Sequence, residues 1–272
     1  MLQQETIDKV LNTRLFLFDM DGTLYLGNRL FPFTKELLDT IRKSGRDYMF
    51  MTNNSSKSVT DYIKKLEKLG IHSAAEDFIT SSQATIHSWK NTCPDELLYV
   101  EGTASLRLEM EKAGFTLTDD IEKVECIVMG FDTELDFKKL EDVCKILCTR
   151  AVRYVATHPD FVCPTEYGSV PDCGAVCEMI FHATGKRPLV IGKPEPLMPQ
   201  LAMQIKGVTP ECTMVAGDRI YTDVKCGNNA GAVSVLVMSG ETDERILAAS
   251  DVRPALIMDD CGTILEILRS HS

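Results

Sequence analysis

The sequence predicts an α/β protein in which a parallel sheet, covered by helices on both faces, carries a second α/β domain inserted into it. Short apolar runs alternate with longer amphipathic stretches along the 272 residues. The apolar runs are nearly continuous, which is typical of parallel strands buried on both faces. The middle of the chain has an alternation of its own and is too long to be a loop. These observations favour two domains, the first of them discontinuous in sequence.

The first segment of the core is expected over residues 1–81. Its expected strands are Arg14–Phe18 and Asp47–Met51, and its expected helices are Thr34–Lys43 and Ser56–Leu69. Leu37, Leu38 and Ile41 share one face of the first helix, which is the pattern of a helix that packs on a core. Gly70 suits the end of the second helix, because glycine commonly follows the last helical residue.

The inserted domain is expected over residues 82–184, and the core is expected to resume over residues 185–272. The expected strands of the insertion are Leu97–Val100, Cys126–Met129 and Val152–Ala156, and its expected helices are Ser105–Ala113, Phe137–Thr149 and Cys173–Ala183. The core is then expected to add the strands Leu189–Ile191, Thr213–Ala216 and Val233–Val237. Such an insertion can close over the carboxyl edge of the core sheet, where open α/β sheets bind ligands.

Charge and composition exclude several classes of function. The chain has 29 Lys+Arg against 40 Asp+Glu, a net charge of −11, which counts against nucleic-acid or membrane binding because both favour a basic face. A local phosphate site is still compatible with this charge. Residues 1–14 lack the apolar segment of a signal peptide, and no run reaches the roughly 18 apolar residues of a membrane span. The ten cysteines show no CxxC or zinc-type spacing, so we expect reduced thiols in a cytoplasmic protein.

Two aspartates directly follow the first expected strand. Asp19 and Asp21 lie in the segment DMDGT, at the carboxyl edge of the predicted sheet. Carboxylates this close are costly to ionise together unless a cation joins them, so the pattern favours either a metal site or a protonated carboxyl group. Gly22 and Thr23 allow the chain to leave the strand in a tight turn, in which free backbone amides could hold an anion. The ordinary alternative is a strand-to-loop turn, in which Asp and Gly are common.

Polar side chains also follow three later strands. Thr52 and Asn53 lie in TNNSS, where the serines could instead be ordinary helix caps. Lys193 lies in IGKP. Most lysines are solvated on the surface, but a lysine that is preceded by a strand and a glycine and followed by a proline is expected to be held in place. Asp218 and Asp223 lie in GDRIYTD, where the first suits a metal ligand and the second could orient that ligand or the lysine.

These four segments, DMDGT, TNNSS, GKP and GDRIYTD, occur in the order typical of one enzyme superfamily. In order and placement they resemble the haloacid dehalogenase (HAD) superfamily, and the length and position of the insertion resemble its NagD-like branch. The resemblance extends over the whole chain, including ATHPD at residues 156–160 and PDCG at residues 171–174. It implies a HAD-type, Rossmann-like parallel core with a larger inserted α/β cap domain.

The resemblance implies a Mg²⁺-dependent phosphatase for small phosphomonoesters such as sugar phosphates or nucleoside monophosphates. Asp19 would be the nucleophile that forms an aspartyl phosphate, and Asp21 would be the general acid and base. The metal would be held by the side chains of Asp19 and Asp218 and the backbone carbonyl of Asp21. Asp223 would orient these groups without binding the metal itself.

The resemblance also implies how substrate is held. Thr52, the Asn53 amide and Lys193 would bind the phosphate group, while His158 and Asp160 of the cap would contact the rest of the substrate. A homodimer through the cap is a further expectation from the resemblance.

Other classes of function remain open or fail on particular features. A phosphotransferase or mutase of the same superfamily would keep Asp21, although the cap type argues against it. A non-catalytic phospho-receiver module would use the aspartate without turnover, but receivers are much shorter and lack the large insertion. A dinucleotide-binding enzyme is excluded, because no GxGxxG follows a predicted strand and GNNAG at residues 227–231 has the wrong spacing.

Overall fold

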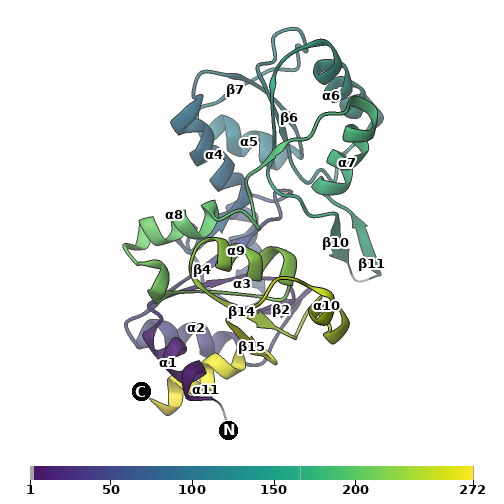
Figure 1. Ribbon diagram of the computed structural model, residues 1–272. Coiled ribbons are helices and arrows are strands. Elements are labelled where there is room, and N and C mark those ends of the chain that lie inside the picture. The colour runs from purple at the N-terminus through teal and green to yellow at the C-terminus, as the bar shows by residue number, and fades with distance from the viewer. Residues whose placement is uncertain (1–2, 166, 272) are drawn as a thin grey trace. The chain divides into compact units, whose positions relative to one another are not determined.

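The computed structural model describes residues 3–165 and 167–271. The chain divides into two compact units, which are shown in Figure 1. The first unit contains the residues up to Thr52, Ile63–Ile79 and the residues from Lys193 on; the second contains Asn53–Tyr62 and Thr80–Gly192. Among the described residues, no helix combines the length and apolar character needed to cross a bilayer. The mixed α/β architecture confirms the predicted fold class.

The first unit is built on a six-stranded sheet in the order β15-β14-β13-β1-β4-β5. The strands are β1 (Leu15–Phe18), β4 (Asp47–Thr52), β5 (Phe78–Thr80), β13 (Thr213–Gly217), β14 (Val233–Val237) and β15 (Leu256–Met258). Every residue of β1 is buried because the strand lies inside the sheet, parallel to β13 on one side and to β4 on the other. The continuous apolar sequence LFLF is therefore explained by burial on both faces.

Helices cover both faces of this sheet. The helices of the first unit are α1 (Gln4–Asn12), α2 (Thr34–Lys43), α8 (Leu197–Lys206), α9 (Lys225–Asn229), α10 (Glu244–Ala249) and α11 (Gly262–Ser270). The helix α3 (Val59–Lys68) begins in residues of the second unit and continues into the first after Tyr62. In Figure 1, α1, α2 and α11 lie together on one side of the sheet, and α8 and α9 lie on the other. The face of α2 predicted from Leu37, Leu38 and Ile41 is buried, as expected. A short hairpin, β2 (Tyr25–Leu26) and β3 (Arg29–Leu30), follows β1.

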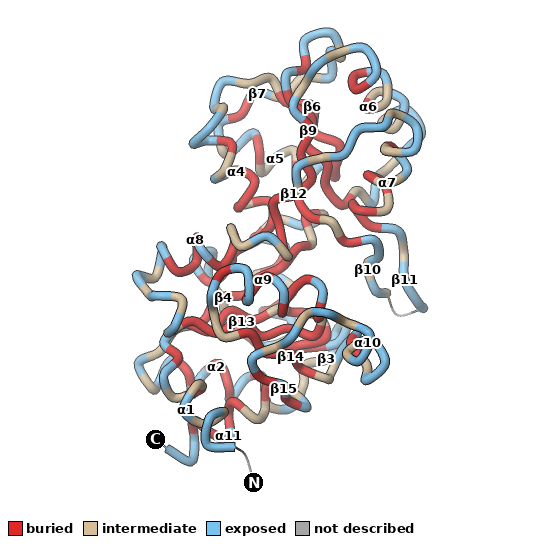
Figure 2. Tube along the Cα trace, in the orientation of Figure 1, coloured by how far each residue is buried: buried red, intermediate tan, exposed pale blue. Residues whose placement is uncertain are grey.

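The second unit has a five-stranded parallel sheet of its own, in the order β12-β9-β8-β6-β7. Its strands are β6 (Leu97–Glu101), β7 (Thr116–Leu117), β8 (Cys126–Met129), β9 (Arg153–Ala156) and β12 (Leu189–Val190). Its helices are α4 (Ser81–Thr92), α5 (Ala104–Lys112), α6 (Phe137–Thr149) and α7 (Cys173–Thr184), and the antiparallel pair β10 (Val162–Thr165) and β11 (Gly168–Pro171) precedes α7. Figure 2 shows buried residues along the strands of both sheets.

One strand belongs to a different sheet from the one predicted. Leu189–Ile191 was expected in the core, but Leu189 and Val190 pair with Val155 and Ala156 of β9, at the edge of the second sheet. A strand of two residues carries no sequence pattern that tells which sheet it joins. The chain passes to the first unit only after Gly192, and the second unit also takes in Asn53–Tyr62, which lay outside the expected boundaries of 82 and 184.

The helix expected to begin at Ser56 begins instead at Val59. Ser58 precedes it, and the Ser58 amide donates to Asp61 Oδ2 at 3.0 Å while the Asp61 amide donates to Ser58 Oγ at 3.3 Å. This reciprocal pair has the pattern of a capping box. Ser55 and Ser56 are therefore not the caps of α3, and the ordinary reading of these two serines in TNNSS is wrong.

Candidate active site

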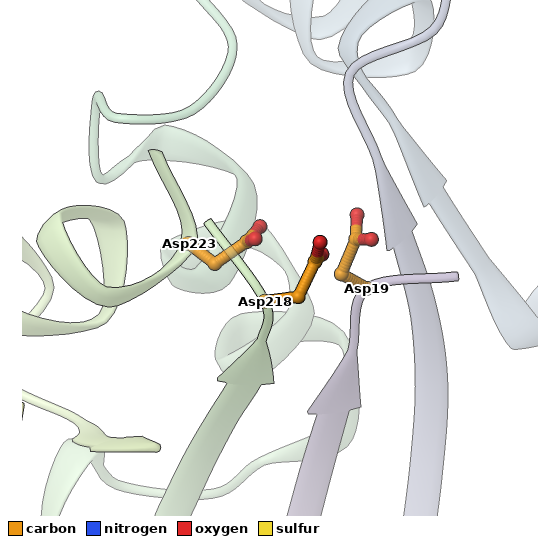
Figure 3. Close-up of side chains that lie close together, drawn as sticks. All are labelled: Asp19, Asp218 and Asp223. Atoms are coloured by element: carbon orange, nitrogen blue, oxygen red, sulfur yellow. The ribbon is translucent and has the colours of Figure 1, made fainter. Parts of the chain in front are cut away.

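The carboxyl ends of β1 and β13 bring three aspartates of the first unit together. Asp19 directly follows β1 and Asp218 directly follows β13, while Asp223 lies in the π-helical turn Ile220–Val224 that comes next. Each of the three offers a carboxylate oxygen, and these oxygens lie within 4.8 Å of one another. Figure 3 shows the three carboxylates gathered beyond the ends of the two neighbouring strands. The parallel pairing of β1 with β13 places Phe18 beside Ala216, which explains why the residues that follow are neighbours.

Lys193 joins two of these aspartates. Its Nζ donates to Asp19 Oδ1 and to Asp223 Oδ1, each at 2.6 Å, and to the Met51 carbonyl oxygen at 3.2 Å. Two carboxylate oxygens and one carbonyl oxygen therefore lie around the ammonium group. Only 3% of the lysine side chain is exposed. Burial acts to lower the pKa of Lys193, but the two carboxylates outweigh it and hold the pKa above its ordinary value, so the lysine is charged.

The charge on Asp19 is costly in this environment. Burial raises the pKa of Asp19 to about 8, opposed by Lys193 and supported by the nearby charges of Asp223 and Asp218. Asp19 and Asp223 therefore share one cation, Lys193, and Asp218 adds a third carboxylate close by. A second cation would favour the ionised form of Asp19, which is the form required of a nucleophile.

Asp218 carries the observation that fits a metal ion. Its Oδ2 accepts the Glu241 amide at 2.6 Å, whereas its Oδ1 is buried and has no hydrogen-bond partner among the described residues. Burial, together with Asp223, raises the pKa of Asp218 to about 6, although the Glu241 amide opposes the shift. Hard carboxylate oxygens are the ligands that Mg²⁺ prefers. The donor set of Asp19 and Asp218 therefore fits a divalent cation.

Two glycines leave the space that Asp218 occupies. A Cβ at Gly240 would lie 2.0 Å from Asp218 Oδ2, and a Cβ at Gly22 would lie 2.5 Å from the same atom. Gly22 also has a φ of +85°, in the region that favours glycine. The glycine of DMDGT thus serves both the turn and the close approach of Asp218.

Asp21 lies outside the cluster of three carboxylates. Its side chain is 39% exposed and its Oδ2 lies 3.9 Å from Lys65 Nζ, while Oδ1 accepts the Gly27 amide at 3.4 Å. The crowding inferred from Asp19 and Asp21 therefore comes from Asp218 and Asp223 instead. Residues two apart in an irregular turn need not point the same way, and only the neighbouring strand shows which carboxylates meet.

Asp223 holds its position through both carboxylate oxygens. Oδ1 accepts Lys193 Nζ, and Oδ2 accepts the Arg219 amide at 3.0 Å. Its side chain is 1% exposed. The structure thus places it where it orients the lysine, one of the two arrangements that GDRIYTD suggested.

The remaining predicted residues divide between the units. Thr52 ends β4 in the first unit. Asn53 belongs to the second unit, where its Nδ2 donates to Asp160 Oδ1 at 3.1 Å. His158 is also in the second unit, buried, with Nε2 3.5 Å from Asp172 Oδ1. The two expected cap residues are therefore both engaged with other residues of the second unit.

Sequence reasoning missed the loop that follows β14. The Glu241 and Thr242 amides donate to Asp218 Oδ2 and to the Asp218 carbonyl oxygen, and Ser239 Oγ donates to the Gly22 carbonyl oxygen at 2.7 Å. The signal was present, since the segment SGET at residues 239–242 begins two residues after the last residue of a predicted strand. It was missed because these contacts use mainly backbone groups, which no side-chain pattern reveals.

Comparisons with known proteins show the family of the chain. The family model described as haloacid dehalogenase-like hydrolase matches residues 16–116, and a second HAD-hydrolase-like model matches residues 190–264. A dihydroxyacetone phosphatase from Corynebacterium glutamicum is 32% identical over 92% of this chain and 90% of its own length.

Two solved structures share the whole architecture. A 4-nitrophenylphosphatase from Thermotoga maritima has a TM-score of 0.90 and 35% identity, covering 95% of this chain and 98% of its own. A structure described as a putative nagD protein has a TM-score of 0.87 and 36% identity, covering 94% of this chain and 98% of its own. The chain therefore belongs to the haloacid dehalogenase-like hydrolases, in their NagD-like phosphatase branch.

Proposed function

We propose that this protein is a Mg²⁺-dependent phosphatase that hydrolyses small phosphomonoesters through an aspartyl phosphate at Asp19. The observation that carries the proposal is the buried arrangement in which Lys193 joins Asp19 to Asp223 beside an Asp218 oxygen that has no partner among the described residues. A nucleophile, a fixed cation and a free metal ligand are the parts that phosphoryl transfer to a carboxylate requires.

In the first step, an Asp19 carboxylate oxygen forms a bond to phosphorus as the bond from phosphorus to the leaving oxygen breaks. Asp21 donates a proton to that leaving oxygen, and the partial exposure of its side chain lets a substrate reach it. In the second step, Asp21 takes a proton from water, the water oxygen bonds to phosphorus, and the Asp19 carboxylate leaves. Inorganic phosphate is released and both aspartates return to their starting states.

The side chains of Asp19 and Asp218 and the backbone carbonyl of Asp21 would hold Mg²⁺. When bound, the metal would neutralise charge on the phosphoryl oxygens and on the two carboxylates. Lys193 contributes a second fixed positive charge, held by Asp223. Because these groups are buried and already oriented, they need little reorganisation as charge develops.

The phosphate group would be held by Thr52, by the backbone amide of Asn53 and by Lys193. The support is their place in the chain: Thr52 ends β4, whose Met51 carbonyl oxygen also accepts Lys193 Nζ. These donors recognise only the phosphate, so the choice among sugar phosphates, nucleoside monophosphates and similar esters must depend on other residues. His158 and Asp160 stay predictions for that role.

The decisive experiment measures release of inorganic phosphate and 4-nitrophenol from 4-nitrophenyl phosphate. We expect turnover with Mg²⁺, loss of turnover with EDTA, recovery when Mg²⁺ is restored, and no turnover in Asp19→Asn. Activity that survives either EDTA or the substitution would refute the mechanism. A panel of phosphorylated sugars and nucleotides, read by phosphate release in the absence of any acceptor metabolite, then separates hydrolysis from phosphate transfer.

Three further parts of the proposal concern its setting. The ten cysteines are present as thiols, which suits a cytoplasmic, reducing compartment. A small phosphorylated metabolite is the proposed partner, and the net charge of −11 argues against nucleic acid and anionic membranes. Pairing into a homodimer through the second unit stays a prediction, which light scattering of the purified protein tests.

A further inference from the structure

We propose that Asp160 is a positioning residue for phosphate binding, which acts by holding the Asn53 side chain and so fixing the Thr52–Asn53 peptide. This inference rests on the proposed function, because it concerns the two residues proposed to hold phosphate. It assigns Asp160 a different role from the substrate contact that the sequence suggested.

The first support is the hydrogen bond between two buried side chains far apart in sequence. Asn53 Nδ2 donates to Asp160 Oδ1 at 3.1 Å, and the two residues are 4% and 6% exposed. A hydrogen bond that involves a charged acceptor in a buried position is stronger than a neutral one and fixes geometry. Since Asn53 is bonded covalently to Thr52, an anchor on its side chain restrains the backbone amide that would bind phosphate.

The second support is that Asn53 is held from other directions as well. Ser81 Oγ donates to the Asn53 carbonyl oxygen at 2.5 Å. A Cβ at Gly192 would lie 2.6 Å from Asn53 Oδ1 and 2.5 Å from the Thr157 carbonyl oxygen, so the glycine leaves room for this packing. Gly192 also donates its amide to the Thr157 carbonyl oxygen at 2.8 Å.

The third support is where these residues lie along the chain. Asn53 is joined by a peptide bond to Thr52, and Gly192 is joined by a peptide bond to Lys193. Of the three proposed phosphate-binding residues, Asn53 is a member of this cluster, and Thr52 and Lys193 are the chain neighbours of its members Asn53 and Gly192. Asp160 is itself fixed, because its carbonyl oxygen accepts the Gly174 amide at 2.8 Å at the start of α7.

The test compares four single variants by their kinetics on 4-nitrophenyl phosphate and by inhibition with inorganic phosphate. Asp160→Ala removes the acceptor, Asn53→Ala removes the donor but keeps the backbone amide, and Asp160→Asn keeps an oxygen acceptor without the charge. Thr157→Val is the matched control, because it removes a buried hydrogen bond to Ser55 Oγ at 3.0 Å in the same cluster without touching the Asn53 side chain.

Inorganic phosphate is the informative probe because it has no leaving group. If Asp160 positions the phosphate donors, Asp160→Ala and Asn53→Ala raise the inhibition constant of inorganic phosphate and lower kcat/KM by roughly 10- to 100-fold, the usual result of a small misplacement. The double variant then loses no more than either single variant, because both remove one interaction. Asp160→Asn retains activity within roughly threefold and Thr157→Val behaves like the wild type.

Opposite results would overturn the inference. A variant Asp160→Ala with an unchanged inhibition constant for inorganic phosphate, but a raised KM for esters, would make Asp160 a contact of the leaving group. Additive losses in the double variant would also contradict it. If Asp160→Ala does not fold, Asn53→Ala tests the same hydrogen bond from its other end.

Failure of the proposed function would look different. The wild type would then neither hydrolyse 4-nitrophenyl phosphate nor bind inorganic phosphate with Mg²⁺ present. Hydrogen exchange of the peptide covering residues 51–56 still decides the positioning role: faster exchange in Asp160→Ala than in the wild type supports it, and exchange equal to that of the wild type overturns it.

Discussion

Replacing Lys193 by Met removes the ammonium group and keeps a long apolar side chain. The substitution leaves Asp19 Oδ1, Asp223 Oδ1 and the Met51 carbonyl oxygen without the donor that now lies at 2.6, 2.6 and 3.2 Å. Asp223 remains buried and Asp19 half-buried, with side-chain exposures of 1% and 15%. The variant therefore tests both the electrostatic balance of the site and its chemistry.

The magnitude follows from the burial of this pair. Removing one partner of a buried ion pair costs about 3–5 kcal/mol. Protonation of Asp19 offsets part of that cost, since its pKa is already raised to about 8 and rises further without the lysine. Loss of one preorganised donor in a transition state lowers kcat by roughly 10²–10³, and Lys193 carries a full charge. We expect Lys193→Met to lower kcat by at least about 10³.

The assay combines kcat on 4-nitrophenyl phosphate at saturating Mg²⁺ with urea unfolding of the metal-free protein. Lys206→Met is the matched control, since Lys206 Nζ also lies 2.6 Å from a carboxylate, Asp47 Oδ2, but this pair is partly solvent-exposed. Its loss should cost less than about 1 kcal/mol and leave kcat unchanged. The reasoning is refuted if Lys193→Met retains kcat within tenfold of the wild type, or if it destabilises no more than the control.

Three other predictions concern protonation and close packing. The pKa values of Asp218 and Asp19 are raised to about 6 and about 8, so the folded, metal-free protein holds protons that the unfolded chain has released above pH ~4. The stability of the metal-free protein should therefore fall from pH 5 to pH 8, while the stabilisation by Mg²⁺ grows over the same range. Thermal unfolding with EDTA and with Mg²⁺ measures both effects, and a Mg²⁺ effect independent of pH would contradict the prediction. Gly240→Ala should raise the Mg²⁺ concentration for half-maximal kcat about tenfold or more, because the new Cβ would lie 2.0 Å from Asp218 Oδ2 and displace the whole carboxylate, including the Oδ1 atom proposed to bind the metal. An unchanged Mg²⁺ titration would count against Asp218 as a ligand. Burial and Asp132 raise the pKa of Glu101 to about 9, so the wild type should lose stability as pH rises through 9 and Glu101→Gln should not. Urea unfolding of both proteins at pH 7 and pH 10 measures this difference. If the free energy of unfolding changes by the same amount in the two proteins, Glu101 is not the titrating group.

Local patterns were sufficient to predict most of the strands. The run LFLF is apolar at every position, and the structure buries all of it between β13 and β4. The amphipathic helix α2 was predicted at its observed bounds because its apolar residues recur at helical spacing. Edge elements were harder, as β12 shows: its two residues satisfy either sheet, and only the pairing with β9 decides between them.

The same division holds for the site. Asp19, Lys193, Asp218 and Asp223 could be predicted from the sequence because each follows a strand or its turn, and parallel strands deliver such residues to one edge. The sequence could not show which carboxylates share the cation, because Lys193 and Asp19 are 174 residues apart. It also could not show that Asp160 holds Asn53 across 107 residues.

The sequence by itself determined the fold class, the order of the motifs and the identity of the charged residues, because these depend on local periodicity and on residue chemistry. The tertiary structure alone decided that Asp218 and Asp223, and not Asp21, crowd Asp19, and that one Asp218 oxygen is left without a partner among the described residues. The physical reason is that pKa values, ion pairs and unpaired acceptors depend on distances and burial, which arise only when strands remote in sequence lie side by side.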